Sequence, residues 1–440
     1  MADETLLSRN GCALHGALKV LGAVNGFQPI VHSSAGCSIQ NKLASVLYTD
    51  NSFNAGWLET PATNLTEKQV VFGGTARLRE QIKNTVKIHE ADLYVVVTGC
   101  VPELVGDDVP AMVKEAQDQS FPVISASTPG FKGDVYKGYE IILKSIIGQL
   151  PQLFYHESNK KATLINILGV IPGQDPFWEG SLYALSRLLD LLNIQTNTLV
   201  GFGQDINTWK TIPDAALNLI VSPWGFSIAK YLEETYQSPY LHIGWLPVGT
   251  DDTAGLINEI VKYIPVDADI LQKVLVQQKK LADYHIVKTG EAYFKFNFQK
   301  KIALIGISSS VIGIARFLYY TFGQIISTVI LTDNIPEELR AGISDVLTFS
   351  ERIVFTEDGK KIQDILLEDK PEFILGSSLE RNTANELQAP LLEISSPSAE
   401  HIILNKTYFG YNGALQLIED FASLLIGRKI TQNNTSYLTI

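Results

Sequence analysis

The sequence predicts an α/β protein made of three Rossmann-like domains, each with a parallel sheet flanked by helices. Two observations support this prediction. Short apolar, β-branched runs alternate with longer amphipathic stretches along the chain, as strands and helices do in parallel sheets. The chain also has 440 residues, which is too long for one ordinary core. We therefore expect three domains, at residues 1–155, 156–295 and 296–440.

The first domain is expected to begin with a short buried strand over Gln28–His32, followed by a loop of small residues and a helix that begins near Ser38. Asp92–Thr98 is a β-branched apolar run, typical of a strand covered on both faces. The remaining elements expected here are strands over Val70–Gly74 and Phe121–Ser125, and helices over Ala76–Ile88, Val109–Gln117 and Val135–Leu150.

The apolar periodicity stops between Pro151 and Lys161, and we place the first domain boundary there. A charged, amphipathic helix over Ala268–Tyr293 is expected to lead from the second domain to the third. The other elements expected in these two domains are strands over Ala162–Val170, Leu217–Ser222, Tyr240–Leu246, Lys301–Ile307, Ser327–Leu331 and Phe373–Leu375, and helices over Gly180–Leu192, Thr253–Tyr263, Ser310–Phe322 and Gly413–Ile426.

Composition narrows the class of protein. Hydrophobic residues make up 45% and charged residues 19%, as in a soluble globular protein with an ample core. The net charge of -12 disfavours nucleic acid or an anionic membrane surface as a partner. The sequence has neither a secretory signal in Met1–Asn10 nor an apolar run long enough for a membrane helix. We expect a cytoplasmic protein with no membrane or nucleic-acid partner.

Each of the three cysteines follows a glycine, in the pairs Gly11-Cys12, Gly36-Cys37 and Gly99-Cys100. Glycine before a metal-bound thiolate lets the backbone turn tightly and approach a bulky inorganic cluster. Structural zinc sites use close pairs such as C-x2-C, which this chain lacks. Three widely spaced thiolates suit an iron-sulfur centre whose other ligands come from a second chain. The alternative is that these cysteines are small buried hydrophobic residues.

Cys100 directly follows the strand predicted over Asp92–Thr98, at the carboxyl end where open α/β sheets place their ligands. His32 ends the preceding strand and could be a ligand or donate to cluster sulfide, although a structural role beside the site is favoured. Asp107 or Asp108 is expected to cap the next helix rather than to bind metal.

Signals for nucleotide binding and hydrolytic catalysis are weak. The chain has no G-x-x-x-x-G-K-[ST] motif, and Gly201-Phe202-Gly203 lacks the third glycine of a dinucleotide fingerprint. Neither H-E-x-x-H nor G-x-S-x-G occurs. We therefore do not expect this chain to hydrolyse ATP or bind NAD itself.

A set of motifs along the chain matches one known family. In the first domain they are Gly11-Cys12-Ala13, Ile30–Cys37, Val71–Gly74, Thr98–Asp108 and Thr128–Gly133, and looser ones follow at Leu246–Gly249, Gly376–Ser378 and Gly410–Ala414. With these motifs the chain resembles nitrogenase component 1 subunits, the β-type more closely than the α-type. The resemblance spans nearly the whole chain.

The resemblance implies an oxidoreductase subunit that relays electrons. Cys12, Cys37 and Cys100 fall on the three cysteines through which a β-type subunit holds its share of the P-cluster, an iron-sulfur centre at the interface with an α-type partner. An α2β2 heterotetramer is implied, with electrons arriving from a separate ATP-hydrolysing iron protein and leaving for a metallocluster in the α-type chain. Because no cysteine follows Cys100, the resemblance places no active-site cofactor and no catalytic residue in this chain.

One departure concerns Gly130, which stands where molybdenum-type β-subunits have a serine whose hydroxyl can join the oxidised cluster. Glycine lacks that hydroxyl, so this redox-dependent ligation is not expected. Two alternatives to the reductase stay open at this point. One is a scaffold on which a metallocluster is assembled, although such scaffolds generally keep fewer of the three cysteines. The other is a structural paralogue with inert thiols.

Overall fold

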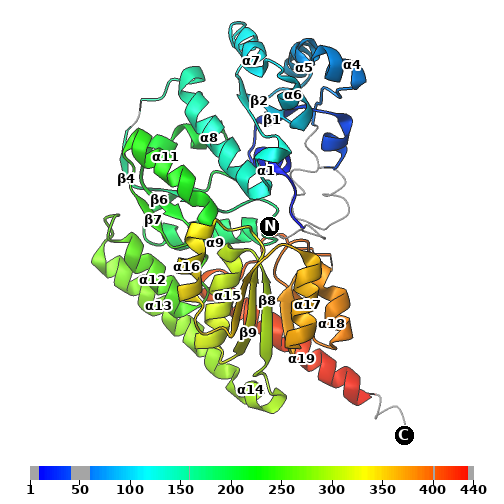
Figure 1. The fold of residues 1–440 in the computed structure, drawn as a ribbon. Helices are drawn as coiled ribbons and strands as arrows, with labels where there is room; N and C mark the ends of the chain where they lie inside the picture. Colours follow the sequence, from blue (N-terminus) through cyan, green and yellow to red (C-terminus); the bar gives the residue numbers. More distant parts are fainter. Residues whose placement is uncertain (1–8, 41–59, 158, 400–401, 435–440) are drawn as a thin grey trace.

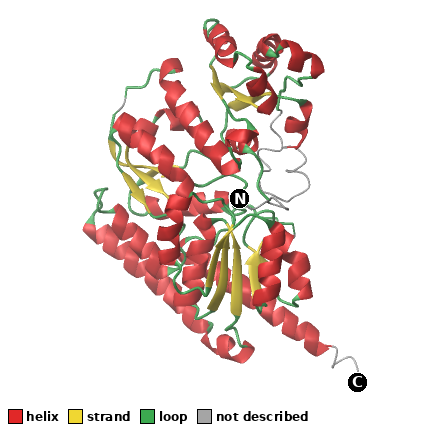
Figure 2. Ribbon diagram, in the orientation of Figure 1, coloured by secondary structure: helices red, strands yellow, loops and turns green. Residues whose placement is uncertain are grey.

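The strands of the chain form three separate parallel sheets in the computed structural model, which describes residues 9–40, 60–157, 159–399 and 402–434. Figures 1 and 2 show the sheets one after another along the chain, with helices packed on their faces. The predicted α/β class with Rossmann-like sheets is confirmed. Each sheet lies within one of the three predicted domain ranges, but the exact domain boundaries stay a prediction.

The first sheet has the order β1-β2-β3, with β1 at Phe27–His32, β2 at Leu93–Thr98 and β3 at Val123–Ala126. Every residue of β1 and β2 is buried, because helices cover both faces. One face packs against α1 (Ala13–Gly22) and α8 (Val135–Leu153), and the other against α5 (Thr75–Ile88) and α7 (Val109–Gln117). The continuous apolar run of β2 follows from this double cover.

Helices α1 and α8 touch backbone to backbone. A Cβ added at Gly16 of α1 would overlap the carbonyl oxygen of Val135, and one added at Gly138 of α8 would overlap that of Ala13. Two main-chain hydrogen bonds close the same contact: the N–H of Ala13 donates to Gly133 at 3.0 Å, and the N–H of Val135 donates to Gly11 at 2.8 Å. The start of α1, and with it Cys12, is therefore fixed to the start of α8.

The second sheet has the order β5-β4-β6-β7 and the third the order β10-β9-β8-β11-β12. Their strands are β4 (Lys161–Leu168), β5 (Gln195–Asn197), β6 (Ala215–Ile220), β7 (Tyr240–His242), β8 (Lys301–Gly306), β9 (Ile325–Leu331), β10 (Arg352–Phe355), β11 (Phe373–Gly376) and β12 (Leu391–Glu393). In the third sheet the chain winds from the central β8 first to one side and then to the other, as in doubly wound folds.

The longer helices around these two sheets are α9 (Trp178–Asp190), α11 (Phe226–Tyr236), α12 (Thr250–Ile260), α13 (Ala268–Lys288), α15 (Ser308–Tyr320), α16 (Glu337–Val346), α17 (Gly359–Asp369) and α19 (Gly410–Asn434). The shorter helices are α4 (Glu67–Phe72), α6 (Cys100–Val105), α10 (Ile206–Lys210), α14 (Gly290–Phe296) and α18 (Arg381–Glu386). The last helix, α19, packs against α12 and α13, so the end of the chain returns to helices that follow the second sheet.

Two predicted elements need correction. The strand expected over Val70–Gly74 is wrong, because Glu67–Phe72 forms helix α4, whose start carries a capping box between Thr66 and Gln69. Val71 and Phe72 are exposed on this helix, so the apolar run that suggested a buried strand lies at the surface. The single helix expected over Ala268–Tyr293 is divided into α13 and α14 at Thr289.

Among the described helices, none combines the length and the apolar character that crossing a bilayer requires.

Asp175 should make the stability of the protein depend on pH. Its side chain is buried before α9, where the main-chain N–H of Phe177 donates to it at 2.8 Å, and burial raises its pKa to about 7. The unfolded chain loses this proton at lower pH than the native protein, so stability falls as the pH rises from the ordinary carboxyl range to about 7.

We therefore expect Asp175→Asn to raise the unfolding temperature at pH 8 more than at pH 5, by an amount that corresponds to roughly 2–3 kcal/mol. Thermal unfolding followed by circular dichroism at the two pH values would measure this. Asp190→Asn, at the exposed end of α9, is the control. Its unfolding temperature should equal that of the parent protein at both pH values. An Asp175→Asn effect that does not change with pH would contradict the prediction.

Candidate functional site around the three cysteines

The three cysteines occupy the starts of three helices. Cys12 directly precedes α1, Cys37 lies in the helical residues 35–40 after β1, and Cys100 is the first residue of α6 after β2. Strands β1 and β2 end side by side, with His32 opposite Thr98, so both lead into the site from the carboxyl edge of the first sheet. All three thiols are free and half-buried. The positive ends of helix dipoles favour a negatively charged ligand at such positions.

Gly130 lies between Cys12 and Cys100. Its main-chain N–H donates to the sulfur of Cys100 at 3.1 Å. A Cβ added to Gly130 would lie 3.3 Å from the sulfur of Cys100 and 3.6 Å from that of Cys12. The two sulfur atoms therefore flank the same glycine, in the turn between β3 and α8, and only a residue without a side chain leaves the space between them open.

Cys37 joins this group through Ser33 and Gly99. The hydroxyl of Ser33 donates to the sulfur of Cys37 at 3.2 Å. A Cβ added to Gly99 would overlap that hydroxyl and lie 3.8 Å from the same sulfur, so Gly99 is required for close packing just before Cys100. The structure thus brings together the three predicted site residues. Gly36 differs, because a Cβ there would meet open space among the described residues.

This arrangement is not a site for a single metal ion. In the parts of the chain that the structure describes, no group of three or more His, Cys, Asp or Glu side chains is close enough to hold one ion. Cys12 and Cys100 flank Gly130, and Cys37 lies beside Gly99, so the three sulfur atoms gather at one edge of the sheet without forming a single-ion site among the described residues. Such an arrangement suits a cluster of several metal ions better than zinc.

His15 is a neighbour of the site that the sequence analysis did not select. Its Nδ1 lies 3.4 Å from the sulfur of Cys12, one helical turn away on α1. Burial lowers the pKa of His15. The spacing from Cys12 to His15 would have indicated this contact only if the helix over Ala13–Gly22 had been predicted.

His32 has the structural role favoured from the sequence. Its Nδ1 lies 3.1 Å from the hydroxyl of Thr63 and its Nε2 lies 3.1 Å from a carboxylate oxygen of Asp107, so both ring nitrogens are engaged. Burial lowers the pKa of His32, while the charge of Asp107 opposes that shift. The imidazole ties the end of β1 to the loop after α6.

The two aspartates after Cys100 also hold the surrounding elements in place. Asp108 caps α7 by accepting from the N–H of Ala111 at 3.1 Å, which confirms the predicted cap. Asp107 accepts from the N–H of Gly74 at 2.6 Å and so fixes the turn between α4 and α5. The bond from Gly74 places this turn beside the loop after α6, and α4 packs against α6.

Glu103 fixes α6 against the loop that contains Gly130. One of its carboxylate oxygens accepts hydrogen bonds from the hydroxyls of Thr98 and Ser127, both at 2.5 Å. Thr98 ends β2 and Ser127 follows β3, so the bonds link the carboxyl ends of two neighbouring strands. Cys100 and Gly130 are thereby held at a fixed separation.

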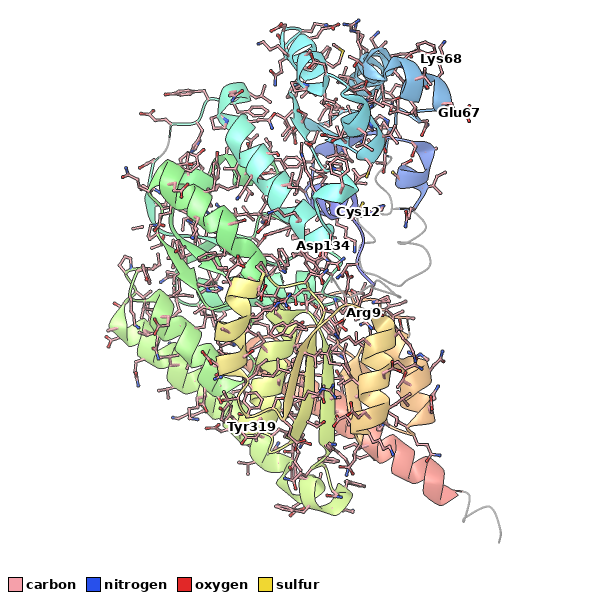
Figure 3. All side chains as sticks on the ribbon, viewed as in Figure 1. Arg9, Cys12, Glu67, Lys68, Asp134 and Tyr319 are labelled. Carbon is pink, nitrogen blue, oxygen red and sulfur yellow. The ribbon has the colours of Figure 1, made fainter. Side chains whose placement is uncertain are left out.

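Exposed apolar side chains lie on α6, on the turn that contains Gly130, and on α4, which packs against α6. Phe72 of α4 is 81% exposed, Leu104 of α6 is 76% exposed, and Phe131, which follows Gly130, is 60% exposed. Figure 3 shows Glu67 and Lys68 of α4 at the outer surface of the first sheet's helices, and Cys12 beside Asp134 toward the middle of the molecule. An apolar surface next to half-buried thiols is typical of a region that another polypeptide covers.

A family model described as nitrogenase component 1 type oxidoreductase matches residues 12–426, which includes all three cysteines. The chain belongs to the nitrogenase component 1 family. This membership agrees with the resemblance that the motifs around Cys12, Cys37 and Cys100 carry, and it makes the chain a nitrogenase-type oxidoreductase subunit.

Other members of the nitrogenase component 1 family match over nearly the full length. The chain is 24% identical to a nitrogenase molybdenum-iron protein beta chain of Methanococcus maripaludis, over 95% of this chain and 93% of that one. It is also 24% identical to the corresponding beta chain of Azotobacter vinelandii, over 94% and 83% of the two chains. The solved structure titled "Nitrogenase Cp1 at pH 6.5" shares the fold, with a TM-score of 0.78 over 97% of this chain and 95% of that one, at 19% identity.

Proposed function

We propose that this chain is the electron-relay, β-type subunit of a nitrogenase or nitrogenase-like reductase in the cytoplasm. In this proposal Cys12, Cys37 and Cys100 hold one half of a P-cluster-type iron-sulfur centre. The observation that carries it is the gathering of three free, half-buried thiols at the carboxyl edge of the first sheet, each at the start of a helix.

The residues fit an iron-sulfur cluster in three respects. Thiolates are the ligands that such clusters use. Gly130 leaves the space between the sulfur atoms of Cys12 and Cys100 open, where any side chain would intrude. The N–H of Gly130 and the hydroxyl of Ser33 donate to two of the sulfur atoms. Hydrogen bonds to cluster sulfurs are one of the ways in which a protein sets the reduction potential.

The other half of the cluster is proposed to belong to an α-type subunit of the same family, in an α2β2 heterotetramer. Three thiols are too few for a four-cysteine cluster, and all three are half-buried. The exposed Phe72, Leu104 and Phe131 give the partner an apolar surface around them. This chain would position its thiolates and exclude water from its side of the interface.

A bound cluster would supply one-electron chemistry, by storing electrons from an ATP-hydrolysing iron protein and passing them to a metallocluster in the α-type subunit. This chain contributes neither the phosphate loop for the first step nor a cysteine after Cys100 for the second. Gly130 offers only a main-chain N–H where a serine would offer a hydroxyl. We propose that this chain therefore binds the cluster through sulfur alone.

Metal analysis of the chain, co-purified with its partner, tests this function against the assembly scaffold. We expect stoichiometric iron and acid-labile sulfide, with an EPR spectrum of the P-cluster type after oxidation. A spectrum of a simple four-iron cluster would favour the scaffold. If the purified protein contains no iron and takes up neither iron nor sulfide on anaerobic reconstitution, the chain is a structural paralogue with inert thiols.

A further inference from the structure

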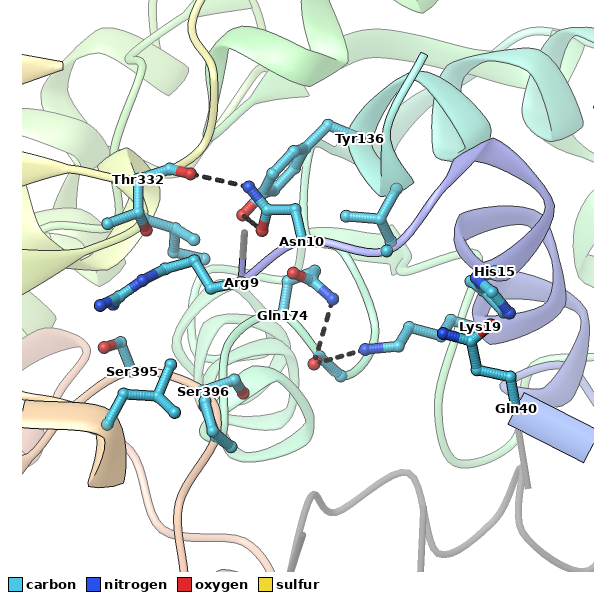
Figure 4. A pocket seen from close by; sticks show the side chains of 16 residues that line it. Arg9, Asn10, His15, Lys19, Gln40, Tyr136, Gln174, Thr332, Ser395 and Ser396 are labelled. Carbon is cyan, nitrogen blue, oxygen red and sulfur yellow. Dashed lines mark hydrogen bonds between the residues drawn. The ribbon is translucent and has the colours of Figure 1, made fainter. Parts of the chain in front are cut away.

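A cavity of about 300 Å³ lies beside Arg9 and Asn10, next to the loops at the carboxyl edge of the third sheet (Figure 4). Its wall includes Arg9, His15 and Lys19 from the N-terminal side, and Thr332 and Ser396 from loops that follow β9 and β12. These loops leave the carboxyl ends of strands on both sides of the central β8. In doubly wound sheets this position, where the winding reverses, is where ligands bind.

Arg9 is the first sign that the cavity takes a ligand. Its side chain is only 5% exposed, and Nη2 pairs with a carboxylate oxygen of Glu380. Its Nε and Nη1 have no hydrogen-bond partner among the described residues. A buried guanidinium normally has its N–H groups satisfied, since leaving them without partners is costly. Both donors are themselves shielded from solvent, so a ligand in the cavity would reach them when the Arg9 side chain turns toward it.

Two further residues of the same wall carry buried polar atoms without a partner. They are Ser396, through its hydroxyl, and His15, through Nε2, although the ring of His15 also interacts with the main chain of Cys37. Eight such side-chain atoms occur in the described parts of the chain, and four of them belong to the three residues Arg9, His15 and Ser396. Their concentration around one cavity indicates a common missing partner that accepts hydrogen bonds.

The charges around the cavity favour an anion. Arg9 and Lys19 both line it, and the Nζ of Lys19 donates to the carbonyl of Gly173 at 2.8 Å. None of the described residues that line the cavity is Asp or Glu, although the chain as a whole carries a net charge of -12. Two carboxylates lie behind the wall: Glu380 holds one end of the Arg9 guanidinium, and Glu357 accepts from the main-chain N–H of Asn10. A wall that carries two cations and unpaired donors but no carboxylate of its own is suited to oxygen anions.

We propose that this cavity binds a small oxyanion, a carboxylate or a phosphate, with Arg9 as the principal ligand-binding residue. Ser396 completes the site from the loop after β12, and Lys19 adds a positive charge from α1. The volume lies at the low end of the range for ligand pockets, which fits a small metabolite and excludes a dinucleotide. On binding, the unpaired N–H groups of Arg9 turn into the cavity, and the hydrogen bond from Nη2 to Glu380 is kept. The inference is independent of the iron-sulfur centre.

Isothermal titration calorimetry on the full chain, with its partner subunit where the two co-purify, tests the site. The protein is first dialysed into a chloride buffer free of oxyanions, and inorganic phosphate and succinate are the two probes. We expect saturable binding of at least one probe. Arg9→Gln should weaken it about tenfold or more, the loss expected for a charge-assisted hydrogen bond. Arg352→Gln is the control, because Arg352 pairs with Glu368 at the surface and should not affect binding.

Ser396→Ala provides a second variant that leaves the pair between Arg9 and Glu380 intact, and it should weaken binding severalfold in a protein that folds normally. Binding of phosphate alone assigns the site to phosphate compounds, and binding of succinate alone assigns it to carboxylates. If neither probe binds, or if the affinity is the same in the parent, Arg9→Gln and Ser396→Ala, the proposal is wrong.

Discussion

Replacement of Cys37 by alanine should remove most of the iron from the purified complex and loosen the association of the two subunits. The sulfur of Cys37 accepts from Ser33 and lies beside Gly99, so it belongs to the same group as Cys12 and Cys100. A cluster that loses one of three thiolates on this side loses both a covalent ligand and part of the interface that it bridges.

Iron and acid-labile sulfide per heterodimer, together with the dissociation of the subunits on dilution, would measure this loss. Ser38→Ala is a matched control in the same helical segment, because its hydroxyl bonds only to the carbonyl of Ala35 among the described residues. It should retain the iron content of the parent. If the Cys37→Ala complex keeps the full iron content of the parent, Cys37 is not a ligand of the proposed cluster.

The sequence predicted the elements that lead into this site more reliably than the contacts within it. The apolar run of β2 and the start and end of α7 agree with the structure, because β-branched residues and a capping aspartate act locally. The carboxyl-edge rule likewise placed Cys100 correctly at the end of β2. These features depend on neighbours in the chain.

Contacts between distant segments could not be predicted in this way. The position of Gly130 between two sulfur atoms depends on how the loop after β3 folds back over α6. The helix over Ala13–Gly22 was missed because eight of its ten residues are buried, so it lacks the polar face by which an amphipathic helix is detected. His15 was missed with it. The error at α4 has the opposite cause, since its apolar residues lie on the surface.

The contact between α1 and α8 explains how Cys12 reaches the other two cysteines. Cys12 follows no strand of the first sheet, and its place is set by the bonds of Ala13 and Val135 to the neighbouring segment. Those bonds require the two helices to approach closely, which in turn requires glycine at positions 16 and 138. The stability of the first domain and the geometry of the site therefore depend on the same two residues.

Gly138→Ala should consequently be among the most destabilising single-methyl changes in the chain. The new Cβ would overlap the carbonyl oxygen of Ala13, and a main-chain atom cannot move away as a flexible side chain can. We expect a loss of roughly 3 kcal/mol or more in stability, since overpacking here separates two backbones. Thermal unfolding of the purified variant would measure the loss, and the iron content should fall with it as Cys12 shifts.

Gly148→Ala is the matched control, because Gly148 lies on the same helix and its added Cβ would meet only the hydroxyl of Tyr231, at 3.2 Å. Alanine favours a helix over glycine by about 1 kcal/mol, so this variant should be as stable as the parent or slightly more. Gly16→Ala should reproduce the loss from the other helix, and the double variant should lose less than the sum, because one separation of α1 from α8 relieves both overlaps. Equal unfolding temperatures for Gly138→Ala and Gly148→Ala would mean that α1 does not rest on α8, and that Cys12 is positioned by some other contact.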